Sequence, residues 1–408
     1  MSRSAHPLKK RVRPAGRAES LLHRRRLKMA ASAHAYVRGN TVKFYEWLES
    51  TRAAGVIPEG PPVWICGDCH VGNLGPVAST EGKVEIQVRD LDQTVLGNPA
   101  HDLVRLGLSL AMASRSSDLP GVTTALMMEQ VVEGYCKGLL NRHDHDAHRR
   151  IEPIRVIMKQ ALRRKWRHLA QERIEDVTPR IPLGPRFWSL TKAERKQIAA
   201  VINDKQTRTL ITCLRSRPDD APVQMLDAAY WVKGCSSLGR LRYAVLVGIG
   251  ENAKEGMCLL DIKESIKAAA PKVDGERIPK NNAERVVAGA KALSPFLGDR
   301  MLARKLGDRQ VVLRELMPQD LKFEVEALTQ MEAIATARLL ASIVGRAHGR
   351  QMDVTTRRKW VAELSKGHSK SLDAPPWLWR SIVELAATHE AAYLEHCRSY
   401  ALGGEKKG

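Results

Sequence analysis

Apolar residues recur along the chain with two different spacings. A return of apolar side chains every three or four positions predicts helices over 28–50, 102–140, 150–215, 323–350 and 376–400. In the first of these segments Tyr36, Phe44 and Trp47 are the expected core contacts, and Gly39 interrupts the pattern. The pattern therefore predicts helices on both sides of the middle of the chain.

The middle of the chain has shorter apolar runs, which are separated by glycine-containing turns. These runs are 228–232, 241–247, 257–262 and 311–316. Runs of this length between turns predict strands, and one helical stretch at 281–297 interrupts them. Residues 225–315 are therefore expected to form a small, largely antiparallel sheet with one helix. The chain is accordingly predicted to be an α+β protein with a β-rich block between helical ones.

Two further strands are predicted nearer the start of the chain. The apolar run 63–66 and the alternating run 83–88 each have the composition of a strand. A turn that contains Gly72, Gly75 and Pro76 is expected between them. The two runs therefore predict a hairpin-like return of the chain.

The composition excludes a disordered chain and leaves several classes of partner open. The sequence has 408 residues, of which 43% are hydrophobic, and this is enough for two or three domains. Its 66 Lys and Arg residues exceed its 45 Asp and Glu residues, which gives a formal charge of +21. Such a charge suits partners that carry phosphate, from nucleic acid to nucleotides to anionic lipid. Charge alone does not distinguish among them.

The surplus charge is concentrated in residues 1–30 and 151–217, which contain few aromatic residues. A base-stacking platform for nucleic acid is therefore not indicated, and the two segments are interpreted as solvated faces that can attract an anionic partner. The seven cysteines are too sparse for a disulfide framework. No apolar run reaches the roughly 18 residues that a membrane span needs. A cytoplasmic protein with reduced thiols is therefore expected.

The densest polar cluster in an apolar setting is Cys-Gly-Asp-Cys-His-Val-Gly-Asn at residues 66–73. Cys-x-x-Cys-His is the spacing that attaches c-type haem, and Cys-x-x-Cys alone can bind zinc or act as a redox pair. The third interpretation is a catalytic loop for phosphoryl transfer, in which Asp68 accepts a hydroxyl proton and Asn73 offers an oxygen to a metal ion. No export signal supports haem attachment, and no second cysteine pair supports a zinc site.

Two carboxylates at the end of the next predicted strand favour the third interpretation. Asp90 and Asp92 follow the run 83–88. Mg²⁺ bound to nucleotide phosphates needs one or two carboxylates and an amide oxygen, which Asp90 and Asn73 can supply. Asp92 would then assist as a neighbouring or second-metal carboxylate. The alternative is that both aspartates merely cap a turn at the surface.

Three segments carry a resemblance to known proteins, namely 67–73, 89–92 and 97–103. They are similar to the stretch that runs through the catalytic loop and metal-binding aspartate of aminoglycoside phosphotransferases and choline kinases, which are protein kinase-like. The resemblance implies that Asp68 is the catalytic base and that Asp102 is structural. It also implies that Asn73 and Asp90 bind Mg²⁺. The chain departs from the pattern at Cys66, where these kinases usually have histidine.

More closely, the chain resembles an uncharacterised bacterial family, domain of unknown function 2252, over roughly residues 25–350. The supporting segments are 28–32, 36–39, 238–239, 261–264, 285–289 and 346–348. Since this family is uncharacterised, the functional expectation comes from the kinase-like resemblance.

A kinase also needs a loop that covers the nucleotide and a lysine that pairs with its phosphates. Residues 233–240, between two apolar runs, are the candidate loop. The expected phosphate contacts in it are Gly234, Ser236, Ser237 and Gly239. The spacing approaches that of a P-loop, but Arg-Leu replaces Lys-Ser/Thr and a strand follows. A plain hairpin loop would explain the same residues.

Lys263, which follows the run 257–262, is the candidate phosphate-pairing lysine. A cation at this place is costly unless it meets an anion. Glu284 on the following helix is the expected partner, because the adjacent Glu264 points to the opposite face of the strand. The alternative is an edge lysine that extends to water. Residues 317–319 would connect to the helical lobe, where adenine would bond to the backbone.

These parts follow one another as catalytic loop, metal-binding aspartate, helices, glycine loop, lysine, helix and hinge. The order predicts a bilobal protein kinase-like fold in circularly permuted form, since permutation can leave a core unchanged. The expected divisions are a flexible basic arm, a helical lobe with the catalytic loop, a β-rich nucleotide-binding lobe with one helix, and C-terminal helices that pack back on the helical lobe. They cover 1–27, 28–220, 221–320 and 321–402 respectively.

The leading hypothesis is an ATP- and Mg²⁺-dependent phosphotransferase that acts on a hydroxyl acceptor. His70 either assists the proton transfer or is a packed loop histidine. The alternatives are a catalytically inactive nucleotide-binding regulatory protein and a basic nucleic-acid-binding protein. The acceptor stays open, as does nucleotidyl instead of phosphoryl transfer. The loop with His143, His145 and His148 is either a transition-metal site or solvated, and His348 lies either near the active site or merely at a helix end.

Overall fold

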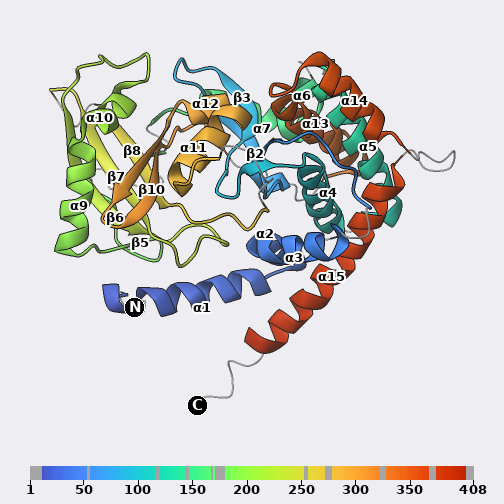
Figure 1. Ribbon diagram of the computed structural model, residues 1–408. Coiled ribbons are helices and arrows are strands. Elements are labelled where there is room, and N and C mark those ends of the chain that lie inside the picture. Colours follow the sequence, from blue (N-terminus) through green and yellow to red (C-terminus); the bar gives the residue numbers. More distant parts are fainter. Residues whose placement is uncertain are drawn as a thin grey trace, which may run out of the picture.

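The computed structural model combines helices with antiparallel sheets, so the α+β class is confirmed. It describes residues 12–52, 56–115, 117, 119–142, 147–166, 169–170, 180–251, 256–271, 278–321, 328–366 and 374–400. In Figure 1 a six-stranded sheet lies on one side of the molecule and a group of long helices lies on the other. Two small sheets and helix α11 (Asn282–Leu293) lie between them.

The six-stranded sheet is antiparallel throughout and has the strand order β5-β6-β7-β8-β10-β9. Its strands are β5 (Phe187–Trp188), β6 (Val223–Trp231), β7 (Arg242–Ile249), β8 (Met257–Glu264), β9 (Met301–Leu306) and β10 (Arg309–Glu315). All but β5 come from the block in which the sequence predicts a sheet, and α11 is the helix predicted within it. The β-rich block is therefore confirmed.

One face of this sheet is covered by α9 (Lys192–Asn203) and α10 (Lys205–Thr212). Their apolar residues form a core with alternate strand residues, which include Leu260 and Ile262 of β8. Because successive side chains of a strand point to opposite faces, Asp261 and Lys263 are turned to the other face. That face looks toward the helices and the small sheets, and it carries the polar residues discussed below.

The long helices are α4 (Ala100–Arg115), α5 (Gly121–Leu139), α13 (Gln330–Gly349), α14 (Val354–Leu364) and α15 (Pro376–Tyr400). α5 and α13 come from opposite sides of the β-rich block and pack closely along glycines. A Cβ atom added at Gly138 would lie 2.0 Å from the Ser342 carbonyl oxygen, and one at Gly345 would lie 2.2 Å from that of Tyr135. Within the described ranges, no helix has an apolar stretch of the length that crosses a membrane.

Two small sheets connect the two parts. β1 (Val63–Ile65) pairs with β4 (Val95–Gly97), and β2 (Leu74–Ala78) pairs with β3 (Val84–Val88). The expected turn with Gly75 and Pro76 is wrong in part, because both residues lie in β2. Proline is tolerated there since the sheet has only edge strands. Further helices of the described chain are α6 (Ala147–Arg150), α7 (Glu152–Arg163), α12 (Pro295–Gly298) and the single-turn segments Pro14–Gly16 and Val71–Asn73.

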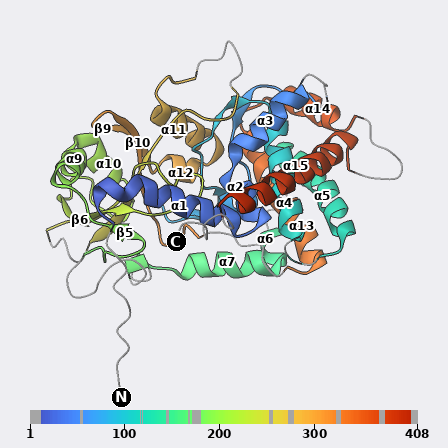
Figure 2. The same cartoon turned by 90° about the horizontal axis from the view of Figure 1, so that it is seen from below.

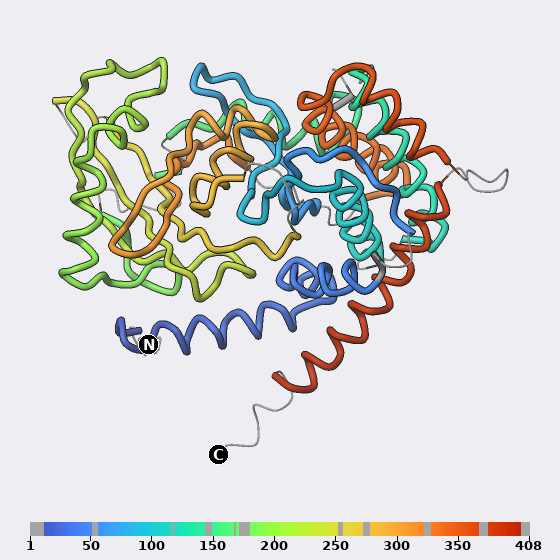
Figure 3. Tube along the Cα trace, viewed as in Figure 1, coloured from blue at the N-terminus to red at the C-terminus, as the bar shows by residue number. Residues whose placement is uncertain are grey.

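The start of the described chain forms α1 (Arg17–Ala30), α2 (Ala33–Gly39) and α3 (Thr41–Arg52). Figures 2 and 3 show α1 running along the six-stranded sheet to α2, with its far end beside the end of α15. Arg17 is only 7% exposed, pairs with Glu194 at 2.6 Å and lies over the Tyr230 ring. Residues 17–27 of the expected arm are thus helical, and distant acidic and aromatic groups compensate the charge of Arg17, Arg24 and Arg26. Residues 1–11 lie outside the described residues.

Candidate active site

The loop at residues 66–73 is anchored by the first turn of α4. The Asp102 carboxylate accepts hydrogen bonds from the backbone N–H groups of Cys66, at 2.7 Å, and Gly67, at 3.0 Å. Gly67 has a φ of +72°, and a Cβ atom there would lie 2.2 Å from the Gln93 carbonyl oxygen, so the position requires glycine. These contacts agree with the structural role that the resemblance implies for Asp102. Cys66 contributes through its backbone, so this anchor does not depend on the side chain that replaces histidine.

His348 supports Asp102 from α13. Its side chain is fully buried, with Nε2 3.2 Å from Asp102 Oδ2 and Nδ1 3.0 Å from the Tyr135 hydroxyl. His348 therefore lies behind the loop, where it holds the residue that anchors it. A helix from beyond the β-rich block thus helps to shape this loop.

Asp68 is paired with Arg105 of α4. Arg105 Nε and Nη2 lie 3.0 and 2.9 Å from Asp68 Oδ1, and Asp68 is 7% exposed. Burial raises the pKa of Asp68, while the charge and the hydrogen bond of Arg105 oppose the rise. A carboxylate with a raised pKa accepts a proton more readily than an ordinary surface aspartate. The sequence reasoning missed Arg105, whose only signal is a lone cation in the apolar helix that follows Asp102.

Two other side chains of the loop lie close to Asp68. Asn73 Nδ2 donates to the Asp68 carbonyl oxygen at 2.9 Å, and in the described part of the chain Asn73 Oδ1 has no hydrogen-bond partner. His70 Nε2 lies 4.0 Å from Asp68 Oδ2. Burial, and then the positive charges of Arg38 and Arg105, hold the pKa of His70 well below its usual value. His70 is therefore a neutral imidazole near pH 7.

Cys66 and Cys69 lack the properties of reactive thiols. Each is 1% exposed, and the hydrogen bond with Cys69, followed by burial, raises the pKa of Cys66 well above its usual value. A metal-binding or redox-active cysteine needs a lowered pKa, and haem attachment needs thiols that a haem can reach. The geometry therefore favours the catalytic-loop interpretation over the two cysteine-based ones.

The β2–β3 ladder brings Asp90 to the end of this loop. Arg89 N donates to the Asn73 carbonyl oxygen at 2.7 Å directly beyond the ladder, so Asp90 follows a residue that is bonded to Asn73. The Asp90 side chain is 48% exposed, whereas that of Asp92 is 20% exposed. The two expected metal ligands, Asn73 and Asp90, are therefore neighbours, and Asp90 is open to a ligand.

Lys263 reaches both aspartates from the six-stranded sheet. Its Nζ lies 3.3 Å from Asp90 Oδ1 and 2.5 Å from Asp92 Oδ2. Partial burial acts to raise the pKa of Asp90, but the charges of Lys263 and Arg314 hold it well below its usual range. Burial, and then the negative charge of Asp90, raise the pKa of Asp92. Asp90 is thus the fully ionised member of the pair.

Glu284 is not the partner of Lys263, and this expectation is wrong. Glu284 is exposed on α11 and forms no ion pair among the residues that the structure describes. The next residue, Arg285, is turned inward instead and is 1% exposed. Its guanidinium donates to the carbonyl oxygens of Thr94, Asp92 and Ile266. Glu264 points away from Lys263 as expected, toward Arg309 at 2.7 Å.

A buried ion cluster beside Lys263 was not predicted. Asp261, 1% exposed, accepts from Arg242 Nε at 2.8 Å and Nη2 at 2.5 Å, and Arg314 lies 3.3 Å away. Burial acts to raise the pKa of Asp261, but the two arginines hold it well below its usual range. Alternation along β8 is enough to place Asp261 on the face of Lys263. Its partners come from β7 and β10, and sequence alone does not pair these strands with it.

The glycine loop lies next to these residues. Gly234 and Gly239 have φ values of +98° and +101°, which favour glycine, while Ser237 is buried and Ser236 is half-buried. Arg240, at the end of the loop, lies 3.5 Å from Asp92. The loop therefore approaches the same aspartates as Lys263.

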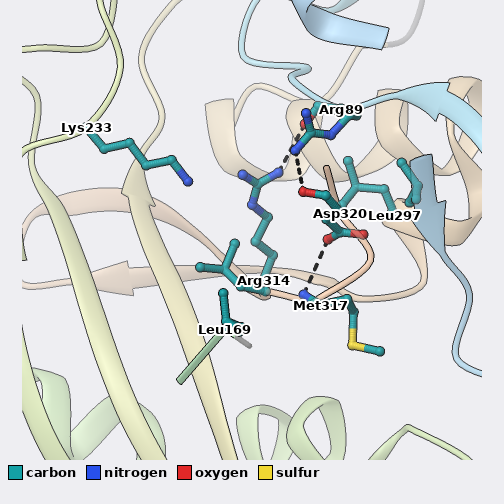
Figure 4. A pocket seen from close by; sticks show the side chains of 9 residues that line it. Arg89, Leu169, Lys233, Leu297, Arg314, Met317 and Asp320 are labelled. Carbon is teal, nitrogen blue, oxygen red and sulfur yellow. Dashed lines mark hydrogen bonds between the residues drawn. The ribbon is translucent and has the colours of Figure 1, made fainter. Parts of the chain in front are cut away.

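Two adjoining pockets lie on the face of the six-stranded sheet that carries Asp261 and Lys263. One is lined by Asp90, Asp92, Lys263 and Arg314 among others, and the second by Leu316, Met317 and Asp320 among others. They share Arg89, Leu297 and Arg314, so they are neighbouring parts of one cleft. In Figure 4 Arg314 lies between two groups. On one side is the segment that carries Lys233, and on the other is Arg89, whose guanidinium donates to the Asp320 carbonyl oxygen. The second pocket therefore includes the segment expected as the hinge.

No group of three or more His, Cys, Asp or Glu side chains arranged for a metal ion occurs in the described segments. His143 and His145 of the expected histidine loop lie outside the described residues, as does the side chain of His148. The structure thus brings together Asp68, His70, Asn73, Asp90, Asp92, Lys263 and the glycine loop. It leaves Glu284 outside.

Comparisons with known proteins give a family and no activity. Neither a search of curated protein sequences nor a search of solved structures gave a match. One family model covers residues 17–399, which is nearly the whole chain and includes every residue of the candidate site. The chain therefore belongs to the family described as "Uncharacterized protein conserved in bacteria (DUF2252)".

Proposed function

We propose that the protein is an ATP- and Mg²⁺-dependent phosphotransferase with a circularly permuted, protein kinase-like fold. The observation that carries the proposal is the 3.3 Å contact between Lys263 and Asp90, which lie 173 positions apart. Phosphoryl transfer needs a lysine on the phosphates and a carboxylate on the metal that bridges them. A single nucleotide must touch both groups, and their proximity meets this requirement.

The residues present fit a magnesium ion bound together with a nucleotide. Mg²⁺ keeps several waters and is commonly bound by one or two carboxylates plus substrate phosphates. Asp90, ionised and half exposed, and Asn73 Oδ1, with no partner among the described residues, would be the protein ligands. Bound there, the ion would neutralise charge on the phosphates. Asp92 would keep Lys263 in place, since it lies 2.5 Å from the lysine.

In the proposed reaction Asp68 accepts the proton of the acceptor hydroxyl. The acceptor oxygen forms a bond to the γ-phosphorus, the bond from that phosphorus to the β,γ-bridging oxygen breaks, and ADP leaves with the bond's electron pair. Lys263 pairs with the phosphates, and the glycine loop covers them. His70, neutral and 4.0 Å from Asp68, can hydrogen-bond to the acceptor without repelling its proton.

The order of the parts supports the permuted arrangement. The helices that hold the catalytic loop, α4 and α13, lie on opposite sides of the β-rich block in the sequence. His348 of α13 nevertheless bonds to Asp102 of α4, so both segments build one site. Glycine loop, lysine strand and hinge then follow the catalytic loop along the chain and lie beside it in space.

A nucleotide-binding protein without turnover is the second candidate. The observation in its favour is that Arg105 occupies one oxygen of Asp68, which is 7% exposed. For Asp68 to act as a base, its carboxylate must bind the acceptor hydroxyl while it remains paired with Arg105. A nucleic-acid-binding role has less support, because Arg17, Arg24 and Arg26 of the basic segment lie over the rings of Tyr230, Trp188 and Tyr400.

The test is ADP release from MgATP across a panel of alcohols, sugars, aminoglycosides and protein hydroxyls, with Asp68→Ala as the control. Acceptor-dependent ADP release by the wild type that Asp68→Ala abolishes is the expected result. Tight MgATP binding without turnover on any acceptor would favour the second candidate. Absence of MgATP binding would refute both.

A further inference from the structure

The helices α1 and α2 hold the glycine loop through several contacts. Lys28 Nζ donates to the Gly234 carbonyl oxygen at 2.9 Å. A Cβ atom added at Gly39 would lie 3.0 Å from Cys235 Sγ, so the end of α2 touches the loop directly. Burial raises the pKa of Cys235, while the charges of Lys28, Arg25 and Arg38 lower it. Three cations of the first two helices therefore lie near Cys235 of this loop.

One of these cations, Arg38, also lies on the catalytic loop. A Cβ atom added at Gly72 would lie 3.0 Å from Arg38 Nη2 and 3.3 Å from His70 Cε1. The guanidinium thus packs on the backbone at Gly72, beside His70, and glycine leaves the room for it. Arg38 therefore lies where the glycine loop, α2 and the catalytic loop meet.

Arg38 and His70 both have unused hydrogen-bonding atoms. Arg38 Nε is buried without a partner, and within the described chain its guanidinium forms neither a hydrogen bond nor an ion pair. His70 is 5% exposed, and its Nδ1 is buried without a partner. A buried polar atom that lacks a partner costs about 1–3 kcal/mol. A ligand that supplies acceptors to the Arg38 guanidinium and to the Nδ1–H tautomer of His70 would remove these costs.

The neighbouring acids are already engaged, so they do not neutralise Arg38. Asp68 is paired with Arg105, and Asp90 is paired with Lys263. The cations also lie at two different places. Lys263 and Arg314 line a pocket together with Asp90. Arg105 pairs with Asp68, and Arg38 packs on Gly72 beside His70. Arg38 and Arg105 therefore lie on the Asp68 side of the site.

We propose that Arg38, with His70 and Lys28, binds an oxyanion of the acceptor. The acceptor is therefore an alcohol that carries a phosphate or carboxylate group. This inference rests on the proposed function, since it takes Asp68 as the base. Arg38 offers a planar fork of donors that matches an oxyanion. His70 lies 4.0 Å from Asp68, so an anion bound by His70 would lie close to a hydroxyl bound by Asp68. Both groups would therefore fit on one small acceptor molecule.

The same oxyanion chemistry has a second source, the terminal phosphate of the nucleotide, and the experiment separates the two. Thermal unfolding of the full-length protein is measured in titrations with sodium phosphate, with sodium chloride at equal ionic strength, and separately with MgATP. The variants are Arg38→Gln and Arg38→Lys. Arg358→Gln, which changes an exposed arginine on α14, is the matched control.

Phosphate should raise the unfolding temperature of the wild type and of Arg358→Gln along a saturable curve that chloride does not reproduce. The apparent phosphate affinity of Arg38→Gln should fall by about tenfold or more, because a charge-assisted hydrogen bond is lost. The apparent phosphate affinity of Arg38→Lys should lie between those of the wild type and Arg38→Gln. The MgATP response should be the same in all four proteins, and Arg38→Gln without ligand should unfold no earlier than the wild type.

A wild-type phosphate response no larger than that of chloride, or an equal response in Arg38→Gln, would overturn the site. Parallel loss of the phosphate and MgATP responses would assign the oxyanion to the nucleotide and overturn the acceptor assignment. Early unfolding of both Arg38 variants without ligand would mark a structural role instead. A wild type that responds to phosphate but not to MgATP would contradict the proposed function and leave the oxyanion site standing.

Discussion

Lys263 Nζ lies 3.3 Å from Asp90 Oδ1, across 173 positions of sequence. The contact joins the six-stranded sheet to the segment that follows the catalytic loop. Each group neutralises charge on the other. A magnesium nucleotide would separate them, since the carboxylate would turn to the metal and the ammonium to a phosphate. Asp92, 2.5 Å from the same ammonium, would keep the lysine oriented during this exchange.

Asp90→Ala should weaken MgATP binding by about tenfold to 100-fold, because it removes a metal ligand. Asp68→Ala should bind MgATP as the wild type does and lose turnover. Isothermal titration with MgATP, with ADP release measured on the same samples, checks both results. Asp90→Ala should still fold normally, because Lys263 retains Asp92. Equal MgATP affinity in Asp90→Ala and the wild type would contradict the metal-binding role.

The acid limb of the pH–rate profile should report on Asp68. Burial raises its pKa, and a protonated Asp68 cannot accept the acceptor proton, so kcat/KM should fall as the pH decreases through this raised value. Arg105 opposes the rise. Arg105→Gln should therefore move the acid limb to higher pH. Arg115→Gln, which changes an exposed arginine of the same helix, should leave the limb unchanged, and an unshifted limb in Arg105→Gln would count against Asp68 as the base.

The sequence predicted elements whose signal is local. Short apolar runs between glycine turns identified the strands of the β-rich block, and the spacing of polar residues identified the loop at 66–73. The sequence did not predict contacts that depend on which face of a helix is buried, or contacts with residues far away in the chain. Periodicity placed a helix at 281–297 but did not show that Arg285, and not Glu284, turns inward. Arg285 is tolerated inside because carbonyl oxygens from distant segments accept its hydrogen bonds.

The basic segment at the start of the chain also makes contacts that the sequence did not predict. The sequence shows Lys and Arg residues that repel one another, which predicts a flexible arm. Arg17 is nevertheless packed, because Glu194 and Tyr230 compensate its charge from positions about 180 to 210 residues away. Only the fold shows that such distant groups meet. For the same reason the ion pair between Asp68 and Arg105 was not predicted.

Asp261→Asn should destabilise the protein at pH 7 by about 3–5 kcal/mol, because it leaves Arg242 buried without its counter-ion. The folded-state pKa of Asp261 is lowered by its arginines, so its stabilising contribution is present above the unfolded value of about 4 and is lost as the pH falls below it. The difference between variant and wild type should therefore narrow in acid. Urea unfolding at several pH values measures this.

The control for this measurement is Glu46→Gln, which breaks the exposed 3.3 Å pair with Lys43. Such a pair contributes about 0–1 kcal/mol. If Asp261→Asn cost no more than Glu46→Gln at pH 7, the buried cluster would not have the strength that its geometry indicates.

Gly138→Ala tests whether the helices on either side of the β-rich block form one core. The added methyl group would lie 2.0 Å from the Ser342 backbone oxygen of α13, so α5 and α13 would have to move apart. Overpacking of this kind costs about 1–3 kcal/mol, which urea unfolding should detect. Gly121→Ala, at the start of the same helix α5, meets no atom within 4 Å and should be neutral or stabilise the protein by up to about 1 kcal/mol. Equal stability of the two variants would mean that α13 does not pack against α5 at Gly138. That result would also contradict the placement of His348, a residue of α13, against Asp102.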